Sequence, residues 1–138
     1  MKRFLNVLML LVALGATAVV QTSCTENPDM EENVIKEGYV RHVILWTLDE
    51  TLSPEEKQQV IAIAEEAMTQ FLKEIPGLVK AEVVYENRLT TSNCDFMFDM
   101  YFSSRQALED FSVNPKHLAV VAQLKPFITG RTCLDVEL

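Results

Sequence analysis

The sequence predicts one α+β domain with an antiparallel sheet and helices on one face. A β-branched and aromatic run covers residues 39–48, and a capped, amphipathic helix follows within residues 51–77. The later segments have the order strand, strand, helix, strand. The whole order is therefore β-α-β-β-α-β, the split β-α-β or ferredoxin-like arrangement. A chain of 138 residues with 49% hydrophobic content is long enough for one such domain with a sizeable core.

The first 38 residues differ in character from this domain. Residues 1–24 have a basic start, an uncharged apolar stretch and small residues before Cys24, the layout of a secretory signal. A cysteine directly after such a stretch resembles the lipobox of bacterial lipoproteins and predicts lipidation at Cys24; ordinary cleavage nearby and an uncleaved anchor are the alternatives. Residues 25–38 are typical of an acidic tether. We therefore expect an exported domain, periplasmic or on the cell surface, tied to a bacterial membrane by lipid.

The charge of the chain limits the kinds of molecule that it is expected to bind. Lys2 and Arg3 are the only charged residues of the leader, so removing it takes two of the 12 basic residues and leaves 10 against 20 acidic ones. Such a surface repels phosphate backbones and anionic membranes. We expect no nucleic-acid partner, and membrane contact only through the lipid.

Cys94 and Cys133 are the two cysteines of the domain. Both fall in strand-like stretches, which favours buried thiols over the disulfide that an oxidising compartment would permit. No pair of cysteines and histidines has metal-ligand spacing, so we expect no metal and no cofactor. Ligation of a haem iron by a histidine is left as an alternative.

The helix within residues 51–77 has clear ends. Ser53 is placed to cap it, Pro54 suits the first helical position, and Glu56 completes a capping box. Its apolar face comprises Val60, Ile63, Ala64, Ala67, Phe71 and Ile75. Pro76-Gly77 ends it.

The remaining segments follow from alternation and caps. Residues 78–89 form a second strand with Val79, Ala81, Val83 and Tyr85 on one face. Residues 94–102 form a third, with Phe96, Phe98, Met100 and Phe102 facing away from Asp95, Met97, Asp99 and Tyr101. Ser103 or Ser104 caps a short helix, Asn114 and Pro115 start another that ends near Lys125-Pro126, and residues 127–138 are the last strand.

The first strand is apolar on both faces. Val40, Ile44 and Trp46 point one way, and Tyr39, Val43 and Leu45 point the other. Helices on one side cover only one face, so a second copy of the sheet is the economical cover for the other. We expect a homodimer that forms an α/β barrel.

Four stretches in order, "VRHVILWTL", "IPGL", "FMFDMYFSSRQALEDF" and "NPKH", resemble the Dabb family of stress-responsive α/β-barrel domains over residues 39–138. The resemblance implies a ferredoxin-like subunit that dimerises through its sheets. Family members include plant stress-induced proteins and a plant polyketide cyclase. The cyclase's base falls on His117 and its strand histidine on His42, whereas its tyrosine falls on Phe111 and the first histidine of its motif on Asn114.

The residues themselves allow a catalytic or a structural role for each histidine. At the third position of a helix started by Asn114 and Pro115, His117 meets the positive end of the helix dipole, which favours the neutral imidazole that a general base needs. His42 shares its strand face with Ile44 and Trp46; the resemblance implies that this face meets the helices, and hence that both histidines line one pocket. Alternatively, His42 is a hydrogen-bonded core residue and His117 braces a helix junction.

The predicted pocket is aromatic and apolar. Its candidate ligand-binding residues are Ile44, Trp46, Phe96, Phe98, Met100 and Phe111, which either hold a flat ligand or fill the space. Three functions follow: binding of a small apolar or aromatic molecule in a stress-related role, a cofactor-independent cyclase or lyase with His117 as base and His42 orienting substrate, and a scaffold that binds nothing. Asp95 and Asp99 are weaker acid/base candidates, and Arg131 and Asp135 are expected to pair across the dimer seam.

Overall fold

The computed structural model describes residues 35–138, so the predicted leader, Cys24 and most of the tether lie outside the described residues. The elements, in chain order, are β1 (Val40–Leu48), α1 (Pro54–Glu74), β2 (Leu78–Val84), β3 (Phe96–Phe102), α2 (Arg105–Ser112), α3 (Pro115–Leu124), the 3₁₀ turn η1 (Lys125–Phe127) and β4 (Ile128–Glu137). The predicted β-α-β-β-α-β order is confirmed, with its second helical part divided into α2 and α3. No helix in this part of the chain has the length and apolarity to cross a membrane.

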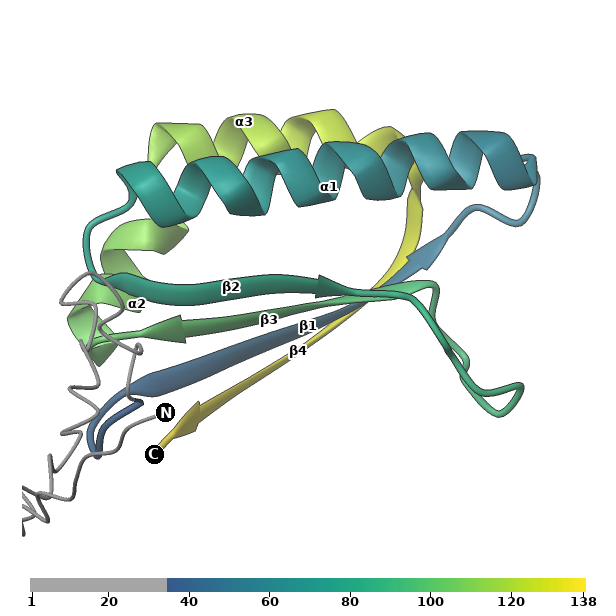
Figure 1. The fold of residues 1–138 in the computed structure, drawn as a ribbon. Coiled ribbons are helices and arrows are strands. Elements are labelled where there is room, and N and C mark those ends of the chain that lie inside the picture. Colours follow the sequence, from purple (N-terminus) through teal and green to yellow (C-terminus); the bar gives the residue numbers. More distant parts are fainter. Residues whose placement is uncertain (1–34) are drawn as a thin grey trace, which may run out of the picture. The chain divides into compact units, whose positions relative to one another are not determined.

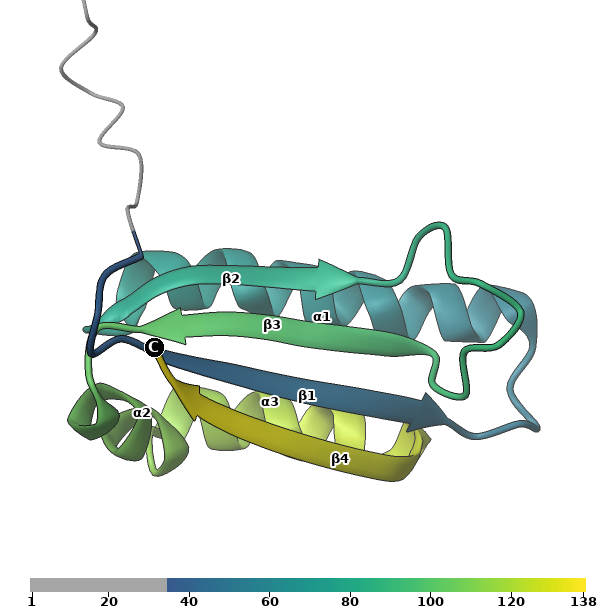
Figure 2. The ribbon, with the colours of Figure 1, turned by 90° about the horizontal axis from the view of Figure 1, so that it is seen from below.

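The four strands form one antiparallel sheet in the order β2-β3-β1-β4. The helices lie over one face of this sheet (Figure 1), and the view from below shows the other face without a cover among the described residues (Figure 2). Residues opposite each other in antiparallel strands share a face. The register therefore decides which β4 side chains lie beneath the helices.

The core lies between the sheet and α1. β1 and β3 contribute every second residue, and Phe96, Phe102 and Leu48 have no exposed surface. α1 begins with the predicted capping box, in which the Glu56 backbone N–H donates to the Ser53 hydroxyl and the Ser53 N–H donates to the Glu56 carboxylate. The predicted apolar face is confirmed, except that Ile63 is only partly buried; Ile61 and Met68 join the core.

The prediction for β2 was partly wrong. The strand ends at Val84, and a shift in the pairing with β3 between Leu78 and Lys80 interrupts the simple alternation. Leu78 and Ala81 are buried, whereas Val79 is half-buried and does not belong to the core. One extra residue in a strand moves every side chain before it to the opposite face, and alternation alone does not reveal where that occurs.

A close approach joins α2 to the turn between α1 and β2. Gly77 in that turn has a φ of +79°, and a Cβ atom there would lie 2.5 Å from the Cβ of Ala107 in α2. The backbone N–H of Ser103, just before α2, donates to the Gly77 carbonyl at 2.8 Å. Glycine is required here both for its backbone conformation and for space.

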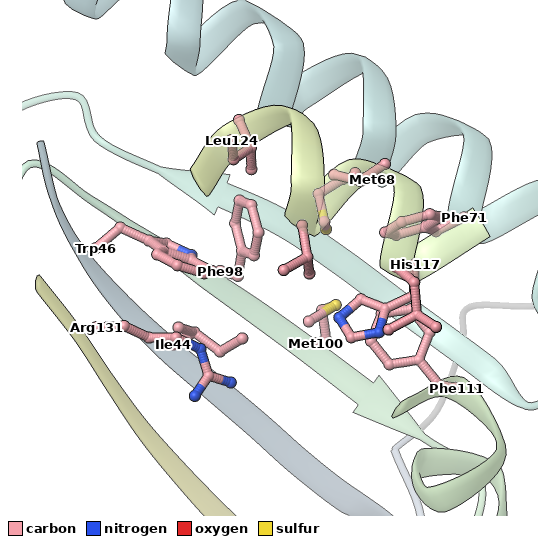
Figure 3. Close-up of a pocket in the computed structure, with 13 residues that line it drawn as sticks. Ile44, Trp46, Met68, Phe71, Phe98, Met100, Phe111, His117, Leu124 and Arg131 are labelled. Carbon is pink, nitrogen blue, oxygen red and sulfur yellow. The ribbon is translucent and has the colours of Figure 1, made fainter. Parts of the chain in front are cut away.

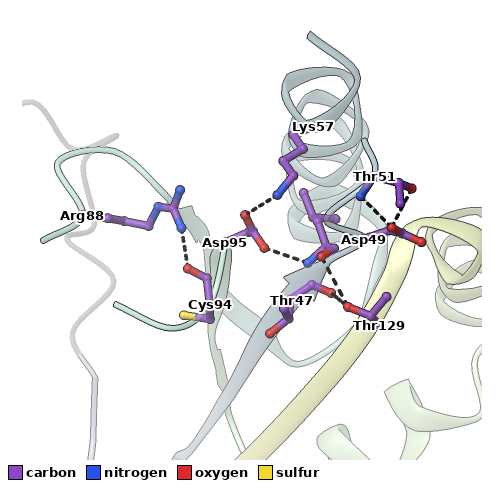
Figure 4. A network of polar contacts seen from close by, with 9 residues as sticks. Thr47, Asp49, Thr51, Lys57, Arg88, Cys94, Asp95 and Thr129 are labelled. Atoms are coloured by element: carbon purple, nitrogen blue, oxygen red, sulfur yellow. Dashed lines mark hydrogen bonds and ion pairs between the residues drawn. The ribbon is translucent and has the colours of Figure 1, made fainter. Parts of the chain in front are cut away.

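Polar contacts stabilise the end of the sheet at which β1 ends and the chain leads into α1 (Figure 4). The Asp95 carboxylate accepts from the backbone N–H of Leu48 at 2.8 Å and pairs with Lys57 of α1 at 3.3 Å. The expectation that Asp95 lies with Asp99 on the outer face was therefore wrong, because Asp95 precedes β3 and turns toward α1. Asp99 does lie on the outer face, where it is buried in a bidentate pair with Arg41.

Candidate functional site

The start of α3 places His117 over the sheet. The Asn114 side chain accepts from the backbone N–H of Lys116 at 2.9 Å, Pro115 is the first helical residue, and the Leu118 N–H closes the first turn onto the Asn114 carbonyl at 3.0 Å. His117 is thus the third residue of the helix, as predicted. Its side chain reaches back under the junction of α2 and α3.

Aromatic rings enclose the His117 imidazole. Its ring centroid lies 4.2 Å from that of Phe111 in a tilted stack, and 6.5 Å from that of Phe71. Burial lowers the pKa of His117 below its usual 6.5, and the charges of His42 and Arg131 lower it further, against the opposing effect of the Ser112 carbonyl. The neutral form is therefore the stable one at neutral pH.

The hydrogen bond of His117 decides its tautomer. Nδ1 lies 3.3 Å from the carbonyl oxygen of Ser112, which only accepts. Nδ1 therefore carries the proton, and in the neutral ring the lone pair is on Nε2. This is the state in which an imidazole accepts a proton from a substrate.

Between the sheet and α1 and α3 lies a cavity of about 160 Å³ (Figure 3). The residues that line it are Ile44, Trp46, Met68, Phe71, Phe98, Met100, Phe111, His117, Leu118, Val120, Val121, Leu124 and Arg131. Five of the six predicted ligand-binding residues are among them. The sixth, Phe96, is fully buried in the core and does not reach the cavity.

Arg131 is the charged lining residue, which the sequence analysis had assigned to the dimer seam and not to the pocket. It lies opposite Trp46 in the β1–β4 register, and its guanidinium is 5.6 Å from the centroid of the Trp46 ring. The signal was available: in a ferredoxin-like sheet the last strand lies beside the first, so the partners of Trp46, Ile44 and His42 lie on the helix side. Arg131 and His117 are the only polar residues of this cavity.

The Trp46 indole adds an unmet hydrogen-bond donor. Trp46 is 6% exposed, and its Nε1 has no acceptor within the described residues. A buried donor without a partner costs on the order of 1–3 kcal/mol. An acceptor brought to this wall of the cavity would recover that energy.

His42 lies beside this cavity but does not line it. It is 7% exposed, its Nδ1 contacts the Asp135 carboxylate, and the Cys133 sulfur lies 3.7 Å from the same nitrogen. All three border a wider, more open hollow of about 460 Å³, which meets the first cavity at Arg131. The prediction that both histidines line one pocket was wrong. His42 lies nearer to the N-terminal end of β1 than Ile44 does, and there it faces α2 and the wider hollow.

Asp135 contacts His42 within the described chain, because strand pairing places it directly opposite His42. Its expected pairing with Arg131 across a dimer seam stays a prediction. Cys133 is exposed and Cys94 half-buried, with no disulfide, so the expected burial of both thiols was wrong in this chain. Partial desolvation of the Cys133 sulfur and the nearby Asp135 charge raise the pKa of its thiol.

Comparisons with known proteins agree with this architecture. The Dabb family model, described as the stress responsive A/B barrel domain, matches residues 40–138. The chain is similar to the crystal structure of a dimeric protein of unknown function with a ferredoxin-like fold from Bacteroides fragilis, at 24% identity and a TM-score of 0.68, over 75% of this chain and 100% of that one.

Two further solved structures show the same fold. A dimeric ferredoxin-like protein from Thermobifida fusca has 22% identity and a TM-score of 0.62 over 76% of this chain and 95% of that one. A Dabb family protein from Mesorhizobium loti has 21% identity and a TM-score of 0.60 over 74% and 98%. No curated protein matches the chain. Since the family model covers more than half of the sequence and the sheet and helices have the expected order, this chain belongs to the Dabb family of stress responsive A/B barrel domains.

Proposed function

We propose that this protein binds a small ring compound with an anionic or hydrogen-bond-accepting group in the cavity beneath α3. One observation carries the proposal: the cavity is apolar apart from Arg131 and His117. An apolar pocket with a few converging polar groups is the usual form of a small-molecule site.

Size and charge define the class of ligand. A volume of about 160 Å³ is close to that of cavities that accept a single benzene-sized ring. The Arg131 guanidinium and the unmet Trp46 N–H are both donors, so they favour a carboxylate, phenolate or enolate on that ring. The chain as a whole is acidic and repels anions, so the attraction for an anionic ligand comes from Arg131 inside the cavity.

The only tryptophan of the chain lines the cavity, so its fluorescence reports on occupancy. Benzoate should change the Trp46 emission saturably, and uncharged toluene should bind more weakly. Arg131→Gln should weaken benzoate binding at least tenfold, since it removes the charge partner of the carboxylate. Arg88→Gln, an exposed arginine away from the cavity, is the matched control. A linear, unsaturable response to benzoate, or equal binding by both variants, would contradict the proposal.

A second candidate function is proton abstraction next to a carbonyl, with His117 as the general base. It is favoured by the Nε2 lone pair that the Ser112 hydrogen bond leaves and by the lowered pKa. Phe111 stacks on the imidazole but brings no hydroxyl to assist the reaction, so binding stands first.

We further infer that the protein acts as a homodimer through the outer face of its sheet. The support is the apolar side chains of that face, with Leu134 60% exposed and Val136 42% exposed in the single chain. Solved structures with this fold from Bacteroides fragilis and Thermobifida fusca are described as dimeric, which is consistent with such pairing.

Export and lipidation are proposed from the sequence of residues 1–24 alone. The pattern is that of a bacterial lipoprotein signal ending at Cys24. Incorporation of labelled fatty acid that is lost in Cys24→Ala would support a lipid-anchored protein outside the cytoplasm. Equal incorporation in the variant would contradict it.

A further inference from the structure

A histidine, a cysteine and a carboxylate meet at the edge of the sheet outside the proposed ligand cavity. Cys133 and Asp135 are two residues apart on β4 and so share a face, and Asp135 lies opposite His42 of β1 in the register. One ligand atom from each of the three lies within 4.8 Å of the others. Cys133 and Asp135 alone do not indicate a metal site in the sequence. The pattern becomes recognisable when strand pairing brings His42 of β1 beside them.

The distances suit tetrahedral coordination. A zinc ion with Zn–S near ~2.3 Å and Zn–N or Zn–O near ~2.0 Å separates a sulfur from a nitrogen or oxygen ligand by roughly 3.5 Å. The Cys133 sulfur lies 3.7 Å from His42 Nδ1 and 3.7 Å from the Asp135 oxygen. His42 and Asp135 are in hydrogen-bond contact, and an ion would take the place of the shared proton and widen that pair.

Packing holds the histidine in place and leaves one side of the cluster accessible. His42 is 7% exposed and lies edge-on to Phe102, at 6.3 Å between ring centroids. The hollow of about 460 Å³ borders all three side chains, so a fourth coordination position can be filled from it by water or a ligand. Glu109 and Glu137 add negative charge to that hollow; Glu137 pairs with Arg105 at 2.6 Å, and Arg131 supplies a further cation.

We propose that His42, Cys133 and Asp135 form a binding site for a divalent transition-metal ion of tetrahedral preference, Zn²⁺ before others, with its fourth position facing the hollow. A thiolate with an imidazole and a carboxylate selects such ions over Mg²⁺ and Ca²⁺, which prefer oxygen ligands. Three protein ligands with one open position are the form of a reactive rather than a closed structural zinc site. The proposal does not depend on what the neighbouring cavity binds.

Cobalt(II) is the probe, because it replaces zinc in tetrahedral sites and shows a thiolate charge-transfer band in the near ultraviolet. The full-length chain, kept reduced by a phosphine, should take up one Co²⁺ with that band, and Zn²⁺ should displace it. Cys133→Ser should abolish the band. Cys94→Ser and Cys24→Ser, which alter the other two cysteines, should keep it.

Two more variants test the other ligands. His42→Gln and Asp135→Asn should each weaken Co²⁺ binding at least tenfold, whereas His117→Gln, which changes the other histidine, should not. Cys133 and Asp135 are exposed, so their variants should fold, and far-ultraviolet circular dichroism checks this. Absence of the band, or a band that survives in Cys133→Ser, would overturn the proposal and leave His42 and Asp135 as a hydrogen-bonded pair only.

Discussion

His117 shows how much its surroundings determine the chemistry of one residue. A helix start disfavours the imidazolium, and partial burial of the imidazole against the rings of Phe111 and Phe71 disfavours it further. The Ser112 carbonyl selects the tautomer. The helix position of His117, its lowered pKa and the proton on Nδ1 all favour Nε2 as a proton acceptor.

With only two histidines in the chain, NMR can follow each imidazole. We expect the His117 pKa to lie below 6.5, because burial together with the charges of His42 and Arg131 disfavours its cation; the nearby Lys116–Glu74 pair is mutually neutralised. If His117 is a base, the exchange of α-protons of acetophenone in heavy water should rise with pH up to that pKa and then level off.

The control for this prediction is His117→Gln, which identifies the His117 resonance and should lower the exchange rate at least a hundredfold. Gln123→Ala on the exposed side of α3 should leave the rate unchanged. A normal or raised pKa would contradict the described burial. A normal exchange rate in His117→Gln would eliminate the enzyme candidate and leave ligand binding untouched.

At the scale of elements, α2 is held close to the turn that leads from α1 into β2. Gly77→Ala should destabilise the protein by about 2–4 kcal/mol, because it combines a left-handed backbone, which costs about 1–2 kcal/mol for other residues, with an overlap against Ala107. Gly38→Ala is the matched control: its φ is +84°, and no atom lies within 4 Å of the added carbon.

Urea denaturation of both variants tests this expectation. Gly38→Ala should lose only the backbone part, about 1–2 kcal/mol. Equal losses in the two variants would mean that α2 moves aside freely and that Gly77 is needed only for its backbone angle.

The elements were more predictable from sequence than the site. Caps such as Ser53 and Asn114 and alternation in β1 and β3 are local signals, and they located those elements well. The shift at Leu78 in β2 and the approach of Arg131 to Trp46 depend on pairing across strands, and the separation of His42 from His117 depends on how the helices pack on the sheet. These are non-local properties, which the pattern along one segment does not reveal.

At the scale of the whole molecule, the outer face of the sheet exposes apolar side chains that a second copy of the chain would cover. Leu134→Asp should weaken the proposed dimer at least tenfold, since a two-fold interface places the new charge in both copies. Val113→Asp, at a 70% exposed position between α2 and α3, should leave it intact. Sedimentation of the domain as a stable monomer at micromolar concentration would contradict the dimer itself.

β1 has one neighbour, β3, that begins 48 residues after β1 ends, and another, β4, that follows later still as the ten-residue strand Ile128–Glu137. A chain made from its N-terminus therefore synthesises the middle of its sheet first and completes it last. Until Ile128–Glu137 emerge, one edge of β1 stays open and the hollow beside His42 lacks a wall. Because the central strand β1 pairs only with strands that are distant in sequence, we expect this sheet to form more slowly than one built from local contacts.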